Sequence, residues 1–156
     1  MSPLWKLIEI RAKAKIRIFK RFCSIFIIPI LSLKGSYIPS GTRFENKPTF
    51  PHGISGIFIS DGTYIGKDAV IFHQVTIGSN TLANSEKRGS PVIGDNCYIG
   101  AGAKIIGNIK IGNNVRIGVN CVVVKDIPDN CTVVNQPSRL IMKESKTDNK
   151  YRGIRS

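Results

Sequence analysis

The sequence predicts an all-β fold, a parallel β-helix built from hexapeptide repeats. Between positions 93 and 123 every sixth residue is aliphatic: Ile93, Ile99, Ile105, Ile111, Ile117 and Val123. The residue four positions after each of these is small or apolar. A period of six fits neither an α-helix nor simple strand alternation, and it is typical of a triangular coil with one hexapeptide on each side. We therefore expect the aliphatic side chains to point into a prism, with the small residues near its corners.

The same register extends upstream, with two interruptions. It is continued at intervals of six, apart from these interruptions, by Ile38, Phe44, Phe50, Ile59, Ile65, Ile71 and Ile77. Three extra residues fall within 52–56, and ten extra residues form a polar excursion at 79–91, rich in Ser, Asn and Gly. Such a loop is expected to leave a rigid scaffold. We assign residues 37–142 to one β-helix domain that contains this loop.

Basic segments flank the predicted prism on both sides. Residues 1–36 are expected to be helical, with an amphipathic helix over 4–21 and then an apolar stretch over 22–33 that is too short to span a bilayer. Eight Lys or Arg residues and one acidic residue precede Gly35. Two interpretations stay open: the segment packs on the prism end, or residues 1–33 bind a membrane surface as a peripheral anchor. Residues 143–156 are expected to form a loose basic tail.

Charge and cysteine content narrow the function classes. The formal net charge is +13, but it is concentrated at the two ends, and no nucleic-acid reader motif accompanies it, so we expect no nucleic-acid partner. Membrane phosphates or an anionic cofactor explain the charge better. The four cysteines form no CxxC pair, and Cys97 and Cys121 occupy inward positions of the hexad. These features predict structural thiols and a cytoplasmic chain, held peripherally at the inner face of the membrane if the second interpretation is right.

The two histidines, His52 and His73, occupy equivalent positions in the repeat. Each follows its inward residue by two positions, and the 21 residues between them equal one eighteen-residue coil plus the three-residue insertion. If the insertion is a local bulge, the two side chains lie on one face about 5 Å apart along the axis. With loop 79–91 treated as an excursion, Ala101 and Val119 continue the same column.

The segment that follows the loop resembles hexapeptide-repeat acyltransferases, which are left-handed parallel β-helices. This resemblance covers residues 37–143 and is carried by IGDNCYIGAGAKIIGNIKIGNNVRIGVNCVVVKDIPDNCTVVNQPSRLI. The strings FPHGISGIFI and IFHQVTIG look like the serine acetyltransferase branch, and still more like short O-acetyltransferases of the colanic-acid and capsule type. The resemblance implies a homotrimer that binds acetyl-CoA between two prisms and transfers the acetyl group directly.

The resemblance also implies roles for individual residues. His52 matches the general base of the serine acetyltransferase branch, and His73 matches a histidine of the colanic-acid type. Five residues match positions that line the coenzyme in related sugar acetyltransferases: Ala101, Val119, Val124, Lys125 and Arg139. The backbone N–H of Gly78, where the loop leaves the prism, is a further candidate, as a donor to the oxyanion.

Departures from the serine acetyltransferase pattern direct the predicted acceptor away from serine. Pro51 replaces the Asp that precedes the base in that branch, and Ser90 replaces its loop histidine. We therefore predict an acetyl-CoA-dependent O-acetyltransferase that acts on a sugar hydroxyl of a cell-surface polysaccharide or its precursor. A serine O-acetyltransferase and a non-catalytic trimeric scaffold are the alternatives. A zinc carbonic anhydrase needs three histidine ligands per site, so with two histidines we expect no metal.

The implied chemistry needs one base. A thioester is already activated, so a neutral imidazole that removes the acceptor's hydroxyl proton is sufficient, and no Ser or Cys nucleophile is needed. Without an Asp at position 51, another group must orient the ring of His52. A backbone carbonyl and Glu45 are the candidates.

Overall fold

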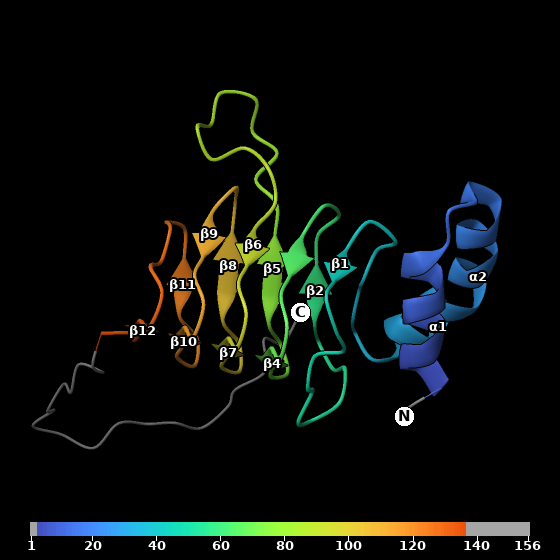
Figure 1. The fold of residues 1–156 in the computed structure, drawn as a ribbon, viewed down its shortest axis with the longest axis horizontal. Helices are drawn as coiled ribbons and strands as arrows, with labels where there is room; N and C mark the ends of the chain where they lie inside the picture. The colour runs from blue at the N-terminus through green and yellow to red at the C-terminus, as the bar shows by residue number, and fades with distance from the viewer. Residues whose placement is uncertain (1–2, 137–156) are drawn as a thin grey trace, which may run out of the picture.

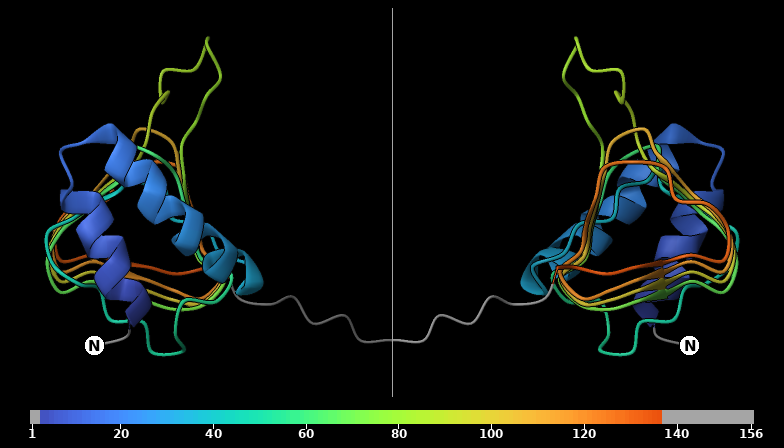
Figure 2. Two further views of the ribbon diagram at one scale, coloured as in Figure 1. Left: turned by 90° about the vertical axis from the view of Figure 1, so that its right-hand side faces the viewer. Right: turned by 90° about the vertical axis from the view of Figure 1, so that its left-hand side faces the viewer.

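The molecule is a triangular parallel β-helix with two α-helices at one end (Figure 1). The computed structural model describes residues 3–136. Viewed along the prism, the coils superpose as a triangle, and one long loop projects from a corner (Figure 2). Each full coil contributes one short strand to each side, because hexads keep their inward residues in line.

Three four-stranded parallel sheets form the sides of the prism. The first side contains β1 (Arg43–Phe44), β3 (Tyr64–Ile65), β6 (Val92–Ile93) and β9 (Lys110–Ile111). The second contains β4 (Val70–Ile71), β7 (Tyr98–Ile99), β10 (Arg116–Ile117) and β12 (Thr132–Val133). The third contains β2 (Phe58–Ile59), β5 (Thr76–Gly78), β8 (Lys104–Ile106) and β11 (Val122–Val123).

Strand register confirms the predicted hexads across both interruptions. Ile77 pairs with Ile59 in the preceding coil and with Ile105 in the following one, so loop 79–91 is an excursion between coils. Phe44 pairs with Ile65, which places the three extra residues outside the ladder. The inward aliphatic residues from Ile59 to Val123 are at most 2% exposed, and they form one continuous stack. Phe44 and Phe50 depart from this prediction, because they are only partly buried at the end of the stack.

Left-handed backbone conformations turn the chain at the corners. Asn96, Asn114 and Asn130 have φ of 52°, 56° and 59°, a region that Asn adopts more readily than most residues. Their side chains also form a ladder between coils: Asn96 Nδ2 donates to Asn114 Oδ1 at 2.9 Å, and Asn114 Nδ2 donates to Asn130 Oδ1 at 3.0 Å. The same residue type therefore satisfies the turn and links successive coils.

The N-terminal segment forms two helices, α1 (Pro3–Lys13) and α2 (Arg17–Leu33), where the sequence predicted one helix over 4–21. The expected helix is wrong because its two halves bury different faces. Trp5 and Ile8 are buried in α1, whereas Cys23, Ile27 and Leu31 are buried in α2. A break at 14–16 lets the chain fold back so that both stripes pack. The apolar stretch over 22–33 belongs to α2, with Pro29 inside it.

Helix α1 closes the end of the prism. The Trp5 ring lies 5.1 Å from the ring of Phe44 and 5.8 Å from that of Phe50, measured between centroids. Arg11, which does not fit the amphipathic pattern, is 2% exposed, and its guanidinium donates to the carbonyl oxygen of Ile38 and to Ser24 Oγ. Burial lowers the pKa of Arg11 from its ordinary value. The packing interpretation is therefore right for α1.

Two further predictions concern the loop and the tail. Loop 79–91 leaves the prism as expected, and its two arms are joined by an antiparallel bridge between Asn80 and Gly89 (Figure 1). The last residues assigned to the prism, the basic tail at 143–156 and Arg139 lie outside the described residues.

Candidate active site

The two histidines meet at one corner of the prism, as their repeat positions predict. His52 Nδ1 lies 2.8 Å from His73 Nδ1, and the ring centroids are 4.9 Å apart. His73 follows β4 and precedes β5, and His52 occupies the equivalent corner of the preceding coil. The three-residue insertion is therefore a local bulge, and the histidines lie on neighbouring coils.

Backbone geometry places four residues in the same turn position of successive coils. His52, His73, Ala101 and Val119 are each followed by a residue with positive φ: Gly53 (68°), Gln74 (58°), Gly102 (71°) and Asn120 (55°). The coils are linked here as well, because Gly102 N–H donates to the His73 carbonyl and Asn120 N–H donates to the Ala101 carbonyl. The predicted column is confirmed. Beyond the histidines it continues with the small side chain of Ala101 and the apolar side chain of Val119.

The bulge at 52–56 covers the corner at His73. Gln74 N–H donates to the Ser55 carbonyl at 2.9 Å. A Cβ on Gly56 would lie 3.3 Å from the Cα of Gln74, so glycine permits this close approach. The ring of Phe72 packs edge-on against His52, with centroids 5.4 Å apart. Phe72 thus contacts the His52 ring on one side, and His73 contacts it on another.

The group that orients His52 is His73, which the sequence did not suggest for that role. Glu45, one of the two expected candidates, instead forms a hydrogen bond with Tyr64 that raises the pKa of that phenol. Because the two Nδ1 atoms share one hydrogen bond, one neutral ring donates and the other accepts. The donating ring then has a basic Nε2, and the accepting ring carries its proton on Nε2. The pair therefore offers one proton acceptor and one proton donor at the same corner.

The remaining coenzyme candidates lie at the other corner of the side of the prism that the third sheet forms. Gly78 ends β5, and its register partner is Ile106 in β8. Val124 and Lys125 directly follow β11 and are exposed. The histidine column therefore lies at the corner where the strands of the third sheet begin. Gly78, Val124 and Lys125 lie at the corner where these strands end. Within one chain, Gly78 is not brought to the histidine corner.

A cavity of about 460 Å³ lies beside the bulge, and sequence reasoning missed it. Phe50, Gly53 and Ile54 line it from the prism, and Trp5 lines it from α1. Lys34 and Lys47 add two ammonium groups to its lining; the remaining lining residues are Leu4, Pro48 and Thr49. No periodic signal could have revealed this cavity, because it depends on how α1 docks on the prism.

Metal chemistry was not expected at this corner, and the side chains offer little to support it. Among residues 3–136, no cluster of three or more His, Cys, Asp or Glu side chains could hold a metal ion. Cys97 and Cys121 are buried inward thiols, and burial raises the pKa of Cys97. The reactive groups at the corner are therefore the two imidazoles.

Comparison with known proteins identifies the repeat. Residues 90–125 match the family model described as bacterial transferase hexapeptide (six repeats). Residues 90–125 therefore carry the repeat of the hexapeptide transferases. The hexapeptide match and the structural neighbours imply that the parallel β-helix is left-handed.

Similar curated proteins and solved structures carry the name serine acetyltransferase. The protein from Buchnera aphidicola is 46% identical over 96 residues, which cover 62% of this chain and 36% of the relative. The protein from Helicobacter pylori is 35% identical over 112 residues, which cover 72% of this chain and 64% of the relative. The crystal structure of Neisseria gonorrhoeae serine acetyltransferase has a TM-score of 0.73 and 29% identity, over 87% of this chain and 53% of that one. The chain thus spans between about a third and two thirds of the length of these relatives.

These relatives overturn the predicted sugar acceptor. The expectation of a polysaccharide O-acetyltransferase rested on Pro51 and Ser90, and the closeness to colanic-acid and capsule enzymes is not supported. The hexad motifs specify the scaffold and do not discriminate between acceptors, so two departures carried too much weight. Ser90 illustrates this, because its Oγ donates to the Asp61 carbonyl at 2.6 Å, which gives the serine a structural contact between neighbouring coils. The alternative considered from the sequence, a serine acetyltransferase, is favoured.

Proposed function

We propose that this protein transfers the acetyl group of acetyl-CoA to the hydroxyl of serine, with the pair His52–His73 as its catalytic centre. The observation that supports this most is the 2.8 Å contact between the two Nδ1 atoms, in a chain whose relatives are serine acetyltransferases. Either ring can act as a base, and we assign that role to His52 because it matches the base of the serine acetyltransferase branch. His73 then accepts the His52 Nδ1 proton in a hydrogen bond and so directs the basic Nε2 outward.

In the proposed reaction, His52 Nε2 removes the serine hydroxyl proton as the oxygen attacks the thioester carbonyl carbon. A C–O bond forms, the C–S bond breaks, and the proton passes from the imidazolium to the leaving thiolate. The products are O-acetylserine and CoA, and no covalent acyl-enzyme is involved. The Nε2–H of His73 would donate to the oxyanion or to the attacking hydroxyl.

Acetyl-CoA would lie along the column beyond the histidines. Ala101 is partly buried and Val119 is exposed, so both leave room for the pantetheine arm. Lys125 is exposed at the opposite corner of this side of the prism and would meet phosphates, with Val124 beside it. Since the two groups lie at different corners, we propose that a homotrimer assembles each site from the histidine corner of one copy and the Lys125 corner of the next. Gly78 lies at that same corner, but its pairing with Ile106 directs its backbone N–H and carbonyl toward β8, so the N–H is not a free donor to the oxyanion.

The cavity beside the bulge would receive the serine acceptor. His52 does not itself line this cavity but lies in the sequence between Phe50 and Gly53, which both do. The ammonium groups of Lys34 and Lys47 would attract the serine carboxylate. A Lys47→Ala variant should therefore raise the KM for serine and leave the KM for acetyl-CoA nearly unchanged. Lys67→Ala, which removes an exposed charge at a different corner, is the control.

The deciding experiment measures release of the CoA thiol from acetyl-CoA with and without serine. We expect serine-dependent release from the wild-type protein and thermal stabilisation by CoA alone. If CoA stabilises the protein and serine does not increase thiol release, the acceptor assignment is wrong. If CoA does not bind, the chain is a scaffold and not an acetyltransferase. Light scattering under the same conditions tests the trimer, which a 17.2 kDa species would contradict.

A further inference from the structure

Helix α2 is apolar on two opposite faces, and only one of them is packed. Cys23, Ile27 and Leu31 are buried on the inner face. The opposite face presents large exposed side chains: Ile18 (79% exposed), Phe22 (58%), Ile25 (65%), Phe26 (54%) and Leu33 (90%). Figure 1 places α2 at the end of the molecule, beyond the coils. A contiguous apolar face of this kind on a helix surface marks an interaction site.

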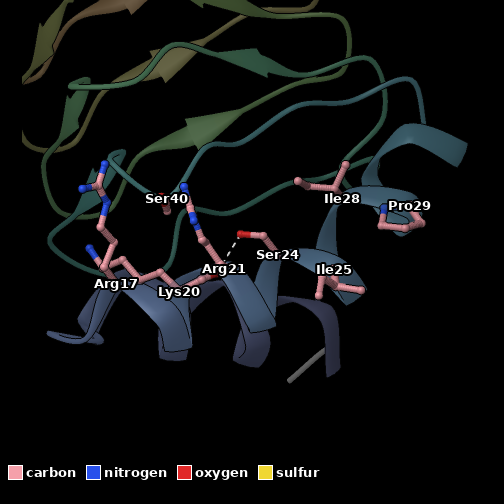
Figure 3. Close-up of a pocket in the computed structure, with 8 residues that line it drawn as sticks. All are labelled: Arg17, Lys20, Arg21, Ser24, Ile25, Ile28, Pro29 and Ser40. Atoms are coloured by element: carbon pink, nitrogen blue, oxygen red, sulfur yellow. Dashed lines mark hydrogen bonds between the residues drawn. The ribbon is translucent and has the colours of Figure 1, made fainter.

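A basic groove adjoins this face. It has a volume of about 510 Å³ and lies between α2 and the segment that enters the prism at Ser40. Three cations line it at one end, Arg17, Lys20 and Arg21, and Ile25, Ile28 and Pro29 line it farther along the helix. In Figure 3 the Arg17 and Arg21 side chains rise from α2 on the side where Ser40 lies. Ile25 belongs to both surfaces, so the apolar face and the cationic groove form one continuous surface.

Arg17, Lys20 and Arg21 lie near the N-terminus of α2, where positive charge destabilises a helix. The first turn of α2 contains no acidic residue, and Ile16 provides no side-chain cap. Positive charge at a helix N-terminus opposes the macrodipole, which favours Asp or Glu there. Among residues 3–136, no ion pair with these cations offsets the local cost, so an external anion would stabilise this end of the helix.

We propose that α2 binds an anionic phospholipid surface. The exposed face of the helix would enter the interface between headgroups and acyl chains, and the groove cations would contact lipid phosphates. A helix with an apolar face and flanking Lys or Arg residues lies in the plane of a bilayer in this way. Within residues 3–136, no helix is long and apolar enough to cross a membrane, so the contact is with the surface.

Charge complementarity favours a membrane over a two-fold contact between the same surfaces of two copies of the chain. A two-fold symmetric contact would bring the same surface of two copies together, and α2 contains no Asp or Glu to pair with Arg17, Lys20 or Arg21. The like charges would repel in that contact. Free phosphate would satisfy the cations but leave the apolar face in water. An anionic bilayer satisfies both.

The test uses the full-length protein and flotation with two kinds of vesicle: phosphatidylcholine alone, and phosphatidylcholine mixed with an equal amount of phosphatidylglycerol. We expect binding to the mixed vesicles, weaker binding at high salt, and little binding to phosphatidylcholine. The triple variant R17Q/K20Q/R21Q should weaken binding to mixed vesicles on the order of 100-fold. Its charge-matched control, K67Q/K110Q/R116Q, removes three exposed cations from the prism and should bind like the wild type.

The apolar face is tested separately with F22Q/I25Q. This double variant should also lose vesicle binding, whereas L82Q/V134Q, which alters two exposed aliphatic side chains far from α2, should retain it. Circular dichroism and thermal unfolding establish that each variant is folded. If the folded wild-type protein does not bind anionic vesicles, the proposal is wrong. It is also wrong if F22Q/I25Q changes the oligomeric mass but not vesicle binding, because the face would then be a contact between copies. Binding of inorganic phosphate to the groove without binding of vesicles would contradict it as well.

Discussion

His52 and His73 are 21 residues apart in the sequence, yet their Nδ1 atoms lie 2.8 Å apart at one corner of the β-helix. In the proposed mechanism this contact takes the place of the acidic residue that orients the base in the serine acetyltransferase branch, where this chain has Pro51. A histidine partner differs from a carboxylate because it accepts a hydrogen bond at Nδ1 and also carries a proton on Nε2 that it can donate. The pair can therefore orient the base and donate to the developing charge.

Replacement of His52 by Ala should lower turnover roughly 10²–10⁴-fold, as loss of a general base does, with CoA affinity nearly unchanged. His73→Ala should lower turnover less. His73→Asn should recover part of that loss, because an amide oxygen can accept the proton of His52 Nδ1. Steady-state rates and CoA titrations on folded variants provide the measurement. If His73→Ala abolishes turnover and His52→Ala remains active, His73 is the general base and His52 is its partner.

Arg11 links α1 to the first coil through the Ile38 carbonyl, so its removal should destabilise the helical cap. Arg11→Met retains much of the apolar stem and leaves the buried carbonyl without its donor, which should lower the free energy of unfolding by about 1–3 kcal/mol. Urea denaturation measures the change. Lys6→Met, at an exposed position of the same helix, is the matched control. Equal midpoints for the two variants would show that the Arg11 contact contributes nothing.

The ladder of asparagines should be sensitive to the backbone conformation at Asn114. Alanine there has no side-chain amide and meets strain at φ 56°, so Asn114→Ala should lower stability by about 1–2 kcal/mol. Asn114→Gly also loses the amide but tolerates this φ, and it should cost less. Thermal unfolding separates the two contributions. A glycine variant as unstable as the alanine variant would assign the effect to the side-chain ladder alone.

Asp126 should make the anchoring of loop 79–91 depend on pH. The Lys110 backbone N–H and then the Lys87 ammonium hold the pKa of Asp126 below its ordinary value. The carboxylate therefore stabilises the folded state above the pKa of the unfolded chain, and this contribution disappears as the pH falls through the lower folded pKa. Asp126→Asn should accordingly speed hydrogen exchange of the loop at neutral pH, with a difference from wild type that shrinks below about pH 4.

The control for this effect is Glu86→Gln, which removes another exposed carboxylate from the same loop. It should leave the exchange rates near those of the wild type at both pH values. Equal protection factors for the wild-type loop at neutral and acid pH, after correction for the intrinsic exchange rate at each pH, would contradict a role for Asp126.

The sequence alone determined the prism and the register of its coils. Each inward residue is identified by a period of six, because contacts in a β-helix join equivalent positions of neighbouring coils. The pairing of Ile77 with Ile105 and the meeting of His52 with His73 follow from counting along the chain. For the same reason the acceptor could not be read from the repeat, since the hexads specify the wall and not what binds beside it.

Only the tertiary structure decided how the helical segment meets the prism. No repeat relates α1 to the coils, so the burial of Arg11, the break before Arg17 and the cavity beside the bulge could not be predicted. The shared corner of the two histidines was predicted, but the hydrogen bond from one ring to the other was not, because it depends on side-chain rotamers that the register does not specify. Local periodicity fixes which residues share a column, whereas docking between unrelated elements depends on the shapes of the complete surfaces.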